Sequence, residues 1–243
     1  MYKFVVASDF HFPYQDENAV KQLLVFIKDY KPDCVILNGD VLDFYCLSRF
    51  DKDPERIGTL QDELNQVSKF LKDLREVCKK KTRIVYVLGN HEDRLRKYIW
   101  THNELAGLEN LQLEKLIDTK TPNVEVVKRF KLDSLLFTHG SIVRKYSAYS
   151  ANAELDKYQT SGSSGHTHRL GSYFKSGYSG NREWHESGCM CRLDAQYLDS
   201  EPNWQQGFLV GLIEDNPYAS KDEFAIYPIK INSNGKFLFP KIK

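Results

Sequence analysis

The sequence predicts an α/β fold in which a second β-sheet packs on a first one. In its first half, short apolar strands alternate with amphipathic helices, the pattern of a parallel sheet wound by right-handed crossovers. In its second half, strand-like segments dominate, and we expect them to form a sheet that packs against the first.

Three β-rich runs in the first half predict buried strands, at residues 2–7, 34–37 and 83–88. Two helices are predicted between them. Over residues 17–30 the apolar side chains fall on one helical stripe, and Lys31-Pro32 ends it. Over residues 57–78, Leu and Val recur at steps of four and three, so this helix should cover a sheet.

After residue 88 the pattern changes from helix and strand to mainly strand. A helical stretch is predicted at residues 94–117, followed by strands at 124–127 and 135–138 that a polar link joins as a hairpin or a short connection. Strands at 205–213 and 224–231 complete the pattern, and we expect them in the second sheet. Because no repeat or linker interrupts the 243 residues, we expect one domain over 1–243.

The composition is that of an ordinary globular protein. Hydrophobic residues make up 41% and charged residues 28%, which argues against a disordered or fibrous chain. The formal net charge of +1 gives no overall attraction to nucleic acid or membranes, so a polyanion would have to be bound locally. No apolar run approaches the roughly 18 residues of a membrane span, and Met1 leads almost directly into a strand. We therefore expect a cytoplasmic protein without a membrane partner.

Five polar clusters stand at the ends of apolar segments, and the first four follow predicted strands. They are residues 9–11, 39–43, 89–92, 139–140 and 165–168. Because the carboxyl ends of parallel strands meet at one edge of a sheet, these clusters can share a site. Their carboxylate, imidazole and amide groups suit manganese, zinc or iron, whereas thiolates would indicate structural zinc.

The spacing and number of these residues strengthen the metal hypothesis. Asp9 and His11 are two residues apart, as are His166 and His168, and in an extended segment that spacing sends both side chains to one face. Taken singly, an Asp after a strand is usually a turn former and a His is usually structural. Since five of the seven histidines lie in the clusters, together they predict a metal site.

The remaining histidines and the five cysteines are assigned no chemistry. His102 and His185 lie outside the clusters and are interpreted as structural. The scattered cysteines resemble small buried hydrophobic residues: Cys34, Cys46 and Cys78. Cys189 and Cys191 lack the second pair that a structural zinc site needs, so core packing is favoured for them as well.

The ordered set D-x-H, G-D-x-x-D, G-N-H-E, an isolated H and G-H-x-H resembles the calcineurin-like metallophosphoesterase family. It runs from Asp9 to His168, about two thirds of the chain, in the family's order. The resemblance implies a four-layer α/β/β/α sandwich of two mixed β-sheets flanked by helices. It also implies hydrolysis of phosphate esters by water activated between two metals, with diesters slightly favoured over monoesters.

The resemblance further implies which residues hold the metals. One metal would be held by Asp9, His11 and His168. The other would be held by Asn90, His139 and His166, with Asp40 bridging the two. The expected cofactors are two divalent ions, manganese first, with zinc, iron or nickel as alternatives.

Three further residues are implied to act beside the metals. His91 would contact the phosphate or the leaving group, and Asp43 would orient its imidazole. Arg94 follows at a spacing that resembles the phosphate-contacting arginine of the protein Ser/Thr phosphatase branch. The alternative, a solvated helix residue among charged neighbours, is left open.

Two segments, residues 44–54 and 169–204, match no branch of the family and should carry specificity. They contain cationic and aromatic side chains able to stack a base or to cover a core: Tyr45, Arg49, Lys52, Arg169, Tyr173, Lys175, Tyr178, Arg182 and Trp184. The expected partner is a phosphate-ester substrate, with a nucleotide or nucleic acid as one option. Two alternatives stay open: a nuclease of the repair exonuclease type, which would normally bring a DNA-capping domain, and a non-catalytic scaffold on the same fold.

Overall fold

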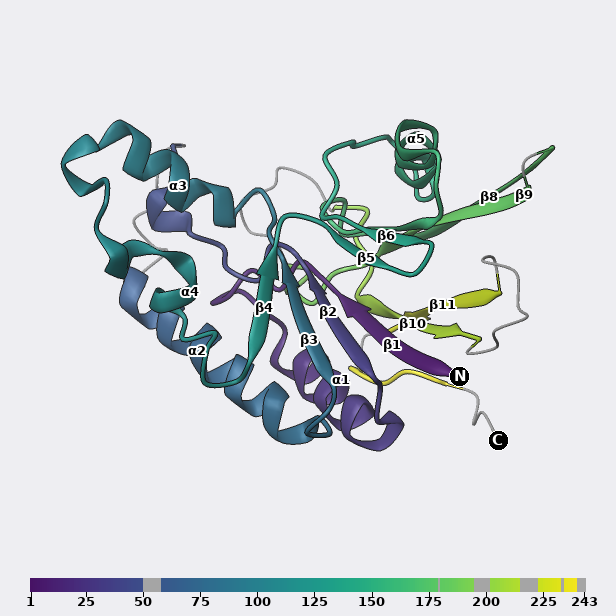
Figure 1. The fold of residues 1–243 in the computed structure, drawn as a ribbon, viewed down its shortest axis with the longest axis horizontal. Helices are drawn as coiled ribbons and strands as arrows, with labels where there is room; N and C mark the ends of the chain where they lie inside the picture. The colour runs from purple at the N-terminus through teal and green to yellow at the C-terminus, as the bar shows by residue number, and fades with distance from the viewer. Residues whose placement is uncertain (50–57, 179, 195–201, 215–222, 233, 240–243) are drawn as a thin grey trace.

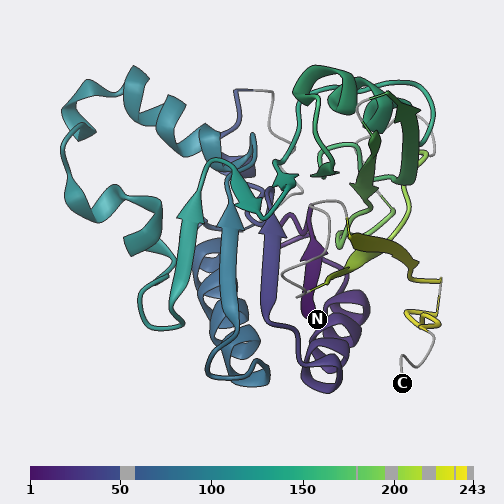
Figure 2. The ribbon, with the colours of Figure 1, turned by 45° about the vertical axis from the view of Figure 1, so that its right-hand side comes forward.

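Two β-sheets face each other, and helices cover their outer sides, in the computed structural model (Figures 1 and 2). It describes residues 1–49, 58–178, 180–194, 202–214, 223–232 and 234–239. The predicted α/β/β/α architecture of two mixed sheets is confirmed.

The first sheet has six strands in the order β11-β10-β1-β2-β3-β4. Its parallel part consists of β1 (Tyr2–Ala7), β2 (Cys34–Asn38), β3 (Arg83–Val87) and β4 (Val124–Val127). β10 (Gly207–Ile213) pairs antiparallel with β1, and β11 (Phe224–Lys230) pairs with β10. The expectation that these last two strands lie in the second sheet is therefore wrong. β10 is apolar along most of its length and buried on both faces, as suits a strand inside a covered sheet.

The second sheet has five strands in the order β5-β6-β7-β9-β8. They are β5 (Phe130–Leu132), β6 (Leu135–Phe137), β7 (Gly162–Ser164), β8 (Leu170–Gly177) and β9 (Gly180–Ser187). β6 and β7 run parallel, so both end at the same edge. The link between β4 and β6 is a connection that carries β5, rather than a hairpin between β4 and β6.

Strand alternation divides the interior into three cores. Val5 and Val35 face α1 (Glu17–Tyr30) and α2 (Leu60–Val77), while Phe4 and Ile36 face the second sheet. Phe137 of the second sheet meets Phe4 edge to face, with ring centroids 5.5 Å apart. The third core lies between the second sheet and α5 (Tyr149–Tyr158), where the buried side chains are Leu136, Ala151, Leu155 and Trp184.

Side-chain caps fix where the two long helices begin. Asp16 accepts a hydrogen bond from the backbone amide of Ala19, and Thr59 and Asp62 form a capping box. The predicted start of the second helix, Ile57, lies outside the described residues, and the described helix begins at Leu60. No helix in the described ranges is long and apolar enough to cross a membrane.

The prediction of one helical stretch over residues 94–117 is wrong. The chain there forms α3 (Glu92–Thr101), two 3-10 turns (Asn103–Leu105 and Glu109–Leu111) and α4 (Leu113–Leu116). Gly107 lies between the two 3-10 turns and has a φ of 84°, a left-handed conformation that a continuous α-helix does not contain. A further 3-10 turn in the described residues, Tyr45–Leu47, follows β2.

Candidate metal centre

All five polar clusters directly follow strands. The first three come after β1, β2 and β3, and the last two come after β6 and β7. They meet where the two sheets approach each other, and most of their side chains are buried. Many cluster residues leave the strands with positive φ angles, which L-residues rarely adopt and which redirect each side chain: Asp9, His11, Asp40, His166 and His168.

Two motif glycines permit this close approach. A Cβ atom on Gly89 would lie 2.1 Å from Oδ1 of Asp40, and one on Gly39 would lie 2.4 Å from Nδ1 of His139. Gly39 also has a φ of 90°. Any larger residue at either position would therefore displace a candidate ligand.

Asp9, His11 and His168 form the first ligand group. Oδ1 of Asp9 lies 3.3 Å from Nε2 of His168 and 3.9 Å from Nε2 of His11, and the two imidazole nitrogens are 3.1 Å apart. All three side chains are buried. The backbone amide of His166 donates to the Asp9 carboxylate, which ties the loop after β7 to the loop after β1.

Asp40 joins this group to a second one. Its Oδ2 lies 3.9 Å from Nε2 of His11 and 3.0 Å from Nε2 of His139. His166 completes a cluster with Asp40 and His139 whose ligand atoms lie within 4.8 Å of one another. Oδ1 of Asn90 is 3.1 Å from Nε2 of His139. The seven predicted ligands are thus brought together in two adjoining groups that share Asp40.

The pKa values in the two ligand groups show that their carboxylates favour positive charge nearby. Burial alone would raise the pKa of Asp9, but His168 and His11 lower it well below its usual value. Burial would lower the pKa of His139, but the charge of Asp40 raises it to about 9. Burial would also lower the pKa of His168, but the charges of Cys191 and Asp9 raise it to about 9. Divalent cations can take the place of these protons, so the nitrogen and oxygen donors fit the ions that the sequence predicts.

His91, Asp43 and Arg94 stand beside the shared carboxylate. Nε2 of His91 is 3.8 Å from Oδ2 of Asp40, and its Nδ1 is 3.1 Å from Oδ1 of Asp43. Asp43 also contacts Nδ1 of His11 at 2.9 Å, so one carboxylate holds two imidazoles. Arg94 donates to the carbonyl of Asp43 and lies 3.1 Å from Nε2 of His91. Since a guanidinium only donates, this contact places the ring proton of His91 on Nδ1, facing Asp43.

Glu92 organises the loops of the site, a role that its sequence motif did not predict. Its Oε2 accepts from the amides of Asp40 and Gly89, and its Oε1 accepts from the amides of Val41 and Leu42. The Tyr86 hydroxyl also donates to Oε1 at 2.6 Å. One buried carboxylate therefore binds the loop after β2 to the loop after β3. The sequence signal for Glu92 was its place as the last residue of the G-N-H-E motif.

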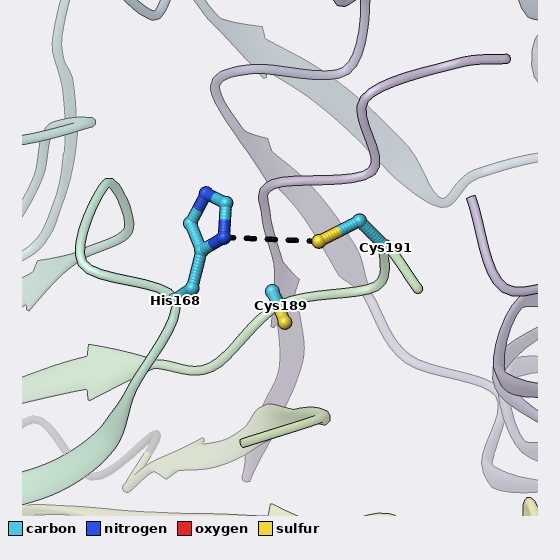
Figure 3. Close-up of side chains that lie close together, drawn as sticks. All are labelled: His168, Cys189 and Cys191. Atoms are coloured by element: carbon cyan, nitrogen blue, oxygen red, sulfur yellow. Dashed lines mark hydrogen bonds between the residues drawn. The ribbon is translucent and has the colours of Figure 1, made fainter. Parts of the chain in front are cut away.

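Core packing, the interpretation favoured for Cys189 and Cys191, does not describe their whole environment, because both lie beside a candidate metal ligand. Sγ of Cys191 lies 3.7 Å from Nδ1 of His168, on the side of the ring opposite the other ligands, and Cys189 lies next to both (Figure 3). All three side chains are buried. A hydrogen bond from Cys189 lowers the pKa of the Cys191 thiol well below its usual value, against the effect of burial. The sequence separation of 23 residues hid this contact.

The side chains expected to carry specificity mostly lie away from the ligands. Lys175 pairs with Asp156, Arg182 donates to Gln159, and Trp184 is buried against α5. Arg169 donates to the carbonyls of Arg144 and Asn203. Tyr173 is half-buried, and Tyr178 is exposed.

Trp204, at the end of the segment, packs on His168, and the two ring centroids are 4.2 Å apart. Tyr45 opens a 3-10 turn and Arg49 follows it, and Lys52 lies outside the described residues.

The two histidines interpreted as structural do lie outside both ligand groups. His102 stacks on Tyr98 with ring centroids 4.0 Å apart. His185 is fully buried between the Ser172 hydroxyl and the Glu183 carboxylate.

A four-layer sandwich with carboxylate, imidazole and amide donors at five strand ends defines a candidate two-metal protein. The chain belongs to the calcineurin-like phosphoesterase family, whose model matches residues 2–170. It is 30% identical to the Gene 54 protein of Mycobacterium phage L5 over 230 residues, covering 85% of this chain and 87% of the relative. A second Gene 54 protein, from Mycobacterium phage D29, is 30% identical over 233 residues, covering 88% and 90%.

Solved structures show the same fold at low sequence identity. Vps29 from Cryptosporidium parvum superposes with a TM-score of 0.51 at 14% identity, covering 98% of this chain and 94% of that one. Wild-type Vps29 from Entamoeba histolytica, in complex with Zn²⁺, superposes with a TM-score of 0.50 at 13% identity, covering 97% and 96%.

Proposed function

We propose that this protein hydrolyses phosphate esters at a site for two divalent cations, manganese first, with diesters favoured over monoesters. One observation carries the proposal: Oδ2 of Asp40 lies between His11 of the first ligand group and His139 of the second. Neighbouring groups with a shared carboxylate are what hydrolysis by two ions requires. When bound, such ions lower the pKa of a shared water and offset the charge on the phosphoryl oxygens.

The protein's own residues supply the rest of the chemistry. The Asp43 carboxylate accepts a hydrogen bond from Nδ1–H of His91 and so holds the ring with Nε2 toward Asp40. A phosphate oxygen that takes over the hydrogen bond from Arg94 would free Nε2 of His91 to face the leaving oxygen. A protonated His91 can then donate to that oxygen as it departs.

The charge of the substrate favours a diester. A diester brings one negative charge, whereas a monoester brings two and calls for a second cationic clamp. Arg94 is the guanidinium beside His91, and its Nη1 donates to the carbonyl of Asp43. Binding a second charge would therefore draw Arg94 away from the residue that orients His91.

The test is to strip the protein of metal and reload it with manganese, zinc, nickel or magnesium. Elemental analysis should find two ions per chain. Bis(p-nitrophenyl) phosphate should then be cleaved with a higher kcat/KM than p-nitrophenyl phosphate at mildly alkaline pH. The opposite ranking across all metals would contradict the diester preference. Two bound ions without hydrolysis of either ester would favour the scaffold alternative.

The matched variant is Asp40→Asn, which keeps the shape of the side chain. Its amide offers one good ligand oxygen and no charge to offset two cations, so activity and metal content should both fall. The metal-free Asp40→Asn protein should stay folded, as circular dichroism would show. Two tightly held ions and undiminished turnover in Asp40→Asn would refute the bridging role.

A further inference from the structure

A groove of about 610 Å³ opens beside the second ligand group. Asn90 and His139 line it on the side of the candidate metal centre. Lys128, Arg129 and Lys157 line it elsewhere, and no carboxylate is among its described lining residues. Three positive charges therefore border a cavity that begins at two candidate ligands.

The three cations come from two separate parts of the fold. Lys128 and Arg129 are exposed between β4 and β5, whereas Lys157 is exposed near the end of α5. Two of the cations lie over the Tyr158 ring. The Arg129 guanidinium is 5.4 Å from the ring centroid, and the Lys157 ammonium is 4.8 Å from it. Lys157 is 3.5 Å from the Glu154 carboxylate, but within the described chain no carboxylate pairs with Lys128 or Arg129. Their charges remain available to an anion.

A second, mainly apolar cavity of about 510 Å³ adjoins this groove. The two cavities share Leu88, Gly89, Asn90 and Lys128. Trp100 lines the apolar one and leaves 60% of its surface exposed, with the Arg96 guanidinium 4.4 Å from its ring centroid. Asp93 and Glu114 also line this second cavity, so it suits a base rather than a phosphate. A basic groove beside an exposed aromatic ring suits a ligand that alternates phosphates with bases, with the phosphates in the basic groove.

We propose that the basic groove binds a phosphate next to the scissile one, and that the substrate is a single-stranded nucleotide chain. The inference rests on the proposed function, since the scissile phosphate would lie against Asn90 and His139. The next phosphate along a strand carries one negative charge, which Lys128 and Arg129 can bind without reading the base. Both cavities have the size of ordinary ligand pockets, so they fit a short stretch of one strand.

The experiment compares two substrates of the manganese-loaded protein. One is an end-labelled single-stranded DNA oligonucleotide of mixed sequence, and the other is bis(p-nitrophenyl) phosphate. In the double variant Lys128→Ala/Arg129→Ala, kcat/KM should fall roughly tenfold more for the oligonucleotide than for the small diester, through KM. The slope of log affinity against log salt should shrink by about 0.7 per lost phosphate contact.

The matched control is Lys21→Ala, an exposed lysine on α1, which covers the face of the first sheet away from the second sheet. It should leave both substrates unaffected. Equal losses for the two substrates in the double variant would overturn the groove assignment. Hydrolysis of the small diester without any cleavage of the oligonucleotide would overturn this inference and leave the proposed function intact.

Direct binding separates the groove from catalysis. In the metal-free protein, fluorescence anisotropy should show that the labelled oligonucleotide binds the double variant more weakly than Lys21→Ala. Equal binding by these two variants would overturn the inference even if hydrolysis were never observed. A duplex that binds the wild-type protein as tightly as the single strand would overturn the preference for one strand.

Discussion

His91 is the residue whose position separates catalysis from metal binding. Its Nε2 is 3.8 Å from Asp40, and its Nδ1 faces Asp43, so its contacts are with residues around the shared carboxylate. We expect His91→Ala to keep both ions and to lower kcat by about 10²- to 10⁴-fold, the usual contribution of a positioned acid. The loss should be smaller with nitrophenol, which needs little help from a proton.

Elemental analysis of His91→Ala beside the kinetics decides this prediction. Loss of one ion from the variant would make His91 a ligand instead. The possible ligand atoms of His11, Asp40 and His91 lie within 4.8 Å of one another, so they are close enough to hold an ion together.

Cys191 is the partner of His168 on the side away from Asp9. Histidine ligands usually donate a hydrogen bond from the N–H of their second ring nitrogen to a neighbour that fixes the ring. Loss of such a neighbour typically costs about 10- to 100-fold in metal affinity. The Cys191 sulfur, 3.7 Å from Nδ1, occupies this position. We expect Cys191→Ala to weaken manganese binding at the first ligand group by about that factor, measured by competition with a chelator.

Cys191→Ser is the control for the cysteine variant, because its hydroxyl can still accept from His168. It should retain more affinity than Cys191→Ala. Equal manganese affinity in the wild type and in both variants would show that the sulfur contact only fills space.

At the scale of elements, two loops depend on the single carboxylate of Glu92. Removing its charge leaves the amides of Asp40 and Gly89 facing an amide donor rather than an acceptor. We expect Glu92→Gln to lower the free energy of unfolding by about 3 kcal/mol or more, since buried unpaired donors cost about 1–3 kcal/mol each. Urea denaturation measures this change.

Glu63→Gln provides the comparison within the same region. Burial raises the pKa of Glu63 to about 8, so the amide replaces a carboxyl that is already largely neutral. Glu63 accepts from the amide of Phe44, and the amide oxygen of Gln can do the same. If Glu63→Gln lowered the free energy of unfolding as much as Glu92→Gln, the special role of Glu92 would be contradicted.

The elements that the sequence predicted well are those with a strong apolar pattern. The strand at Tyr2–Ala7 and the helix at Glu17–Tyr30 match their predicted bounds. By contrast, β7 (Gly162–Ser164) has no apolar side chain, and α5 buries few apolar residues. Short strands and helices of this kind are specified by their neighbours rather than by local periodicity.

The candidate ligands were identified from their motifs, but their surroundings were not. Asp9 and His168 are the first and last residues of the motif region, yet their ligand atoms are 3.3 Å apart. Motif order could place such residues in one site. It gave no sign of the Cys191 contact or of the Glu92 network, because these depend on how loops from different strands fold over one another.

At the scale of the whole molecule, the metal centre lies between the two sheets. Asp9, Asp40 and Asn90 follow strands of the first sheet, whereas His139 and His168 follow strands of the second. Ions bound there would link the layers, so metal binding and folding should be coupled.

This coupling predicts how the stability of the metal-free protein depends on pH. The pKa values of His139 and His168 are raised to about 9 from about 6.5 in the unfolded chain. The stabilising contribution of His139 is therefore complete below pH 6.5 and is lost as the pH rises to 9. The loss at His168 is opposed by its partner Cys191, whose lowered pKa favours the folded state increasingly as the pH rises. The lowered pKa of Asp9 acts in the opposite direction: its contribution is present above about pH 4 and is lost in acid.

We therefore expect the metal-free protein to have its highest Tm between about pH 4.5 and 6.5, and to lose a few kcal/mol of stability by pH 9. Calorimetry in the presence of a chelator measures this curve. Manganese should raise Tm most at alkaline pH, because the ligands bind metal as neutral imidazoles and protons no longer compete. His11 also has a raised pKa, held up by Asp43 and Asp9 against the effect of burial. His139→Gln removes one of these titrating imidazoles and should flatten the metal-free curve. A metal-free Tm that rises between pH 6.5 and 9 would show that these imidazoles do not carry the protons that hold the two sheets together.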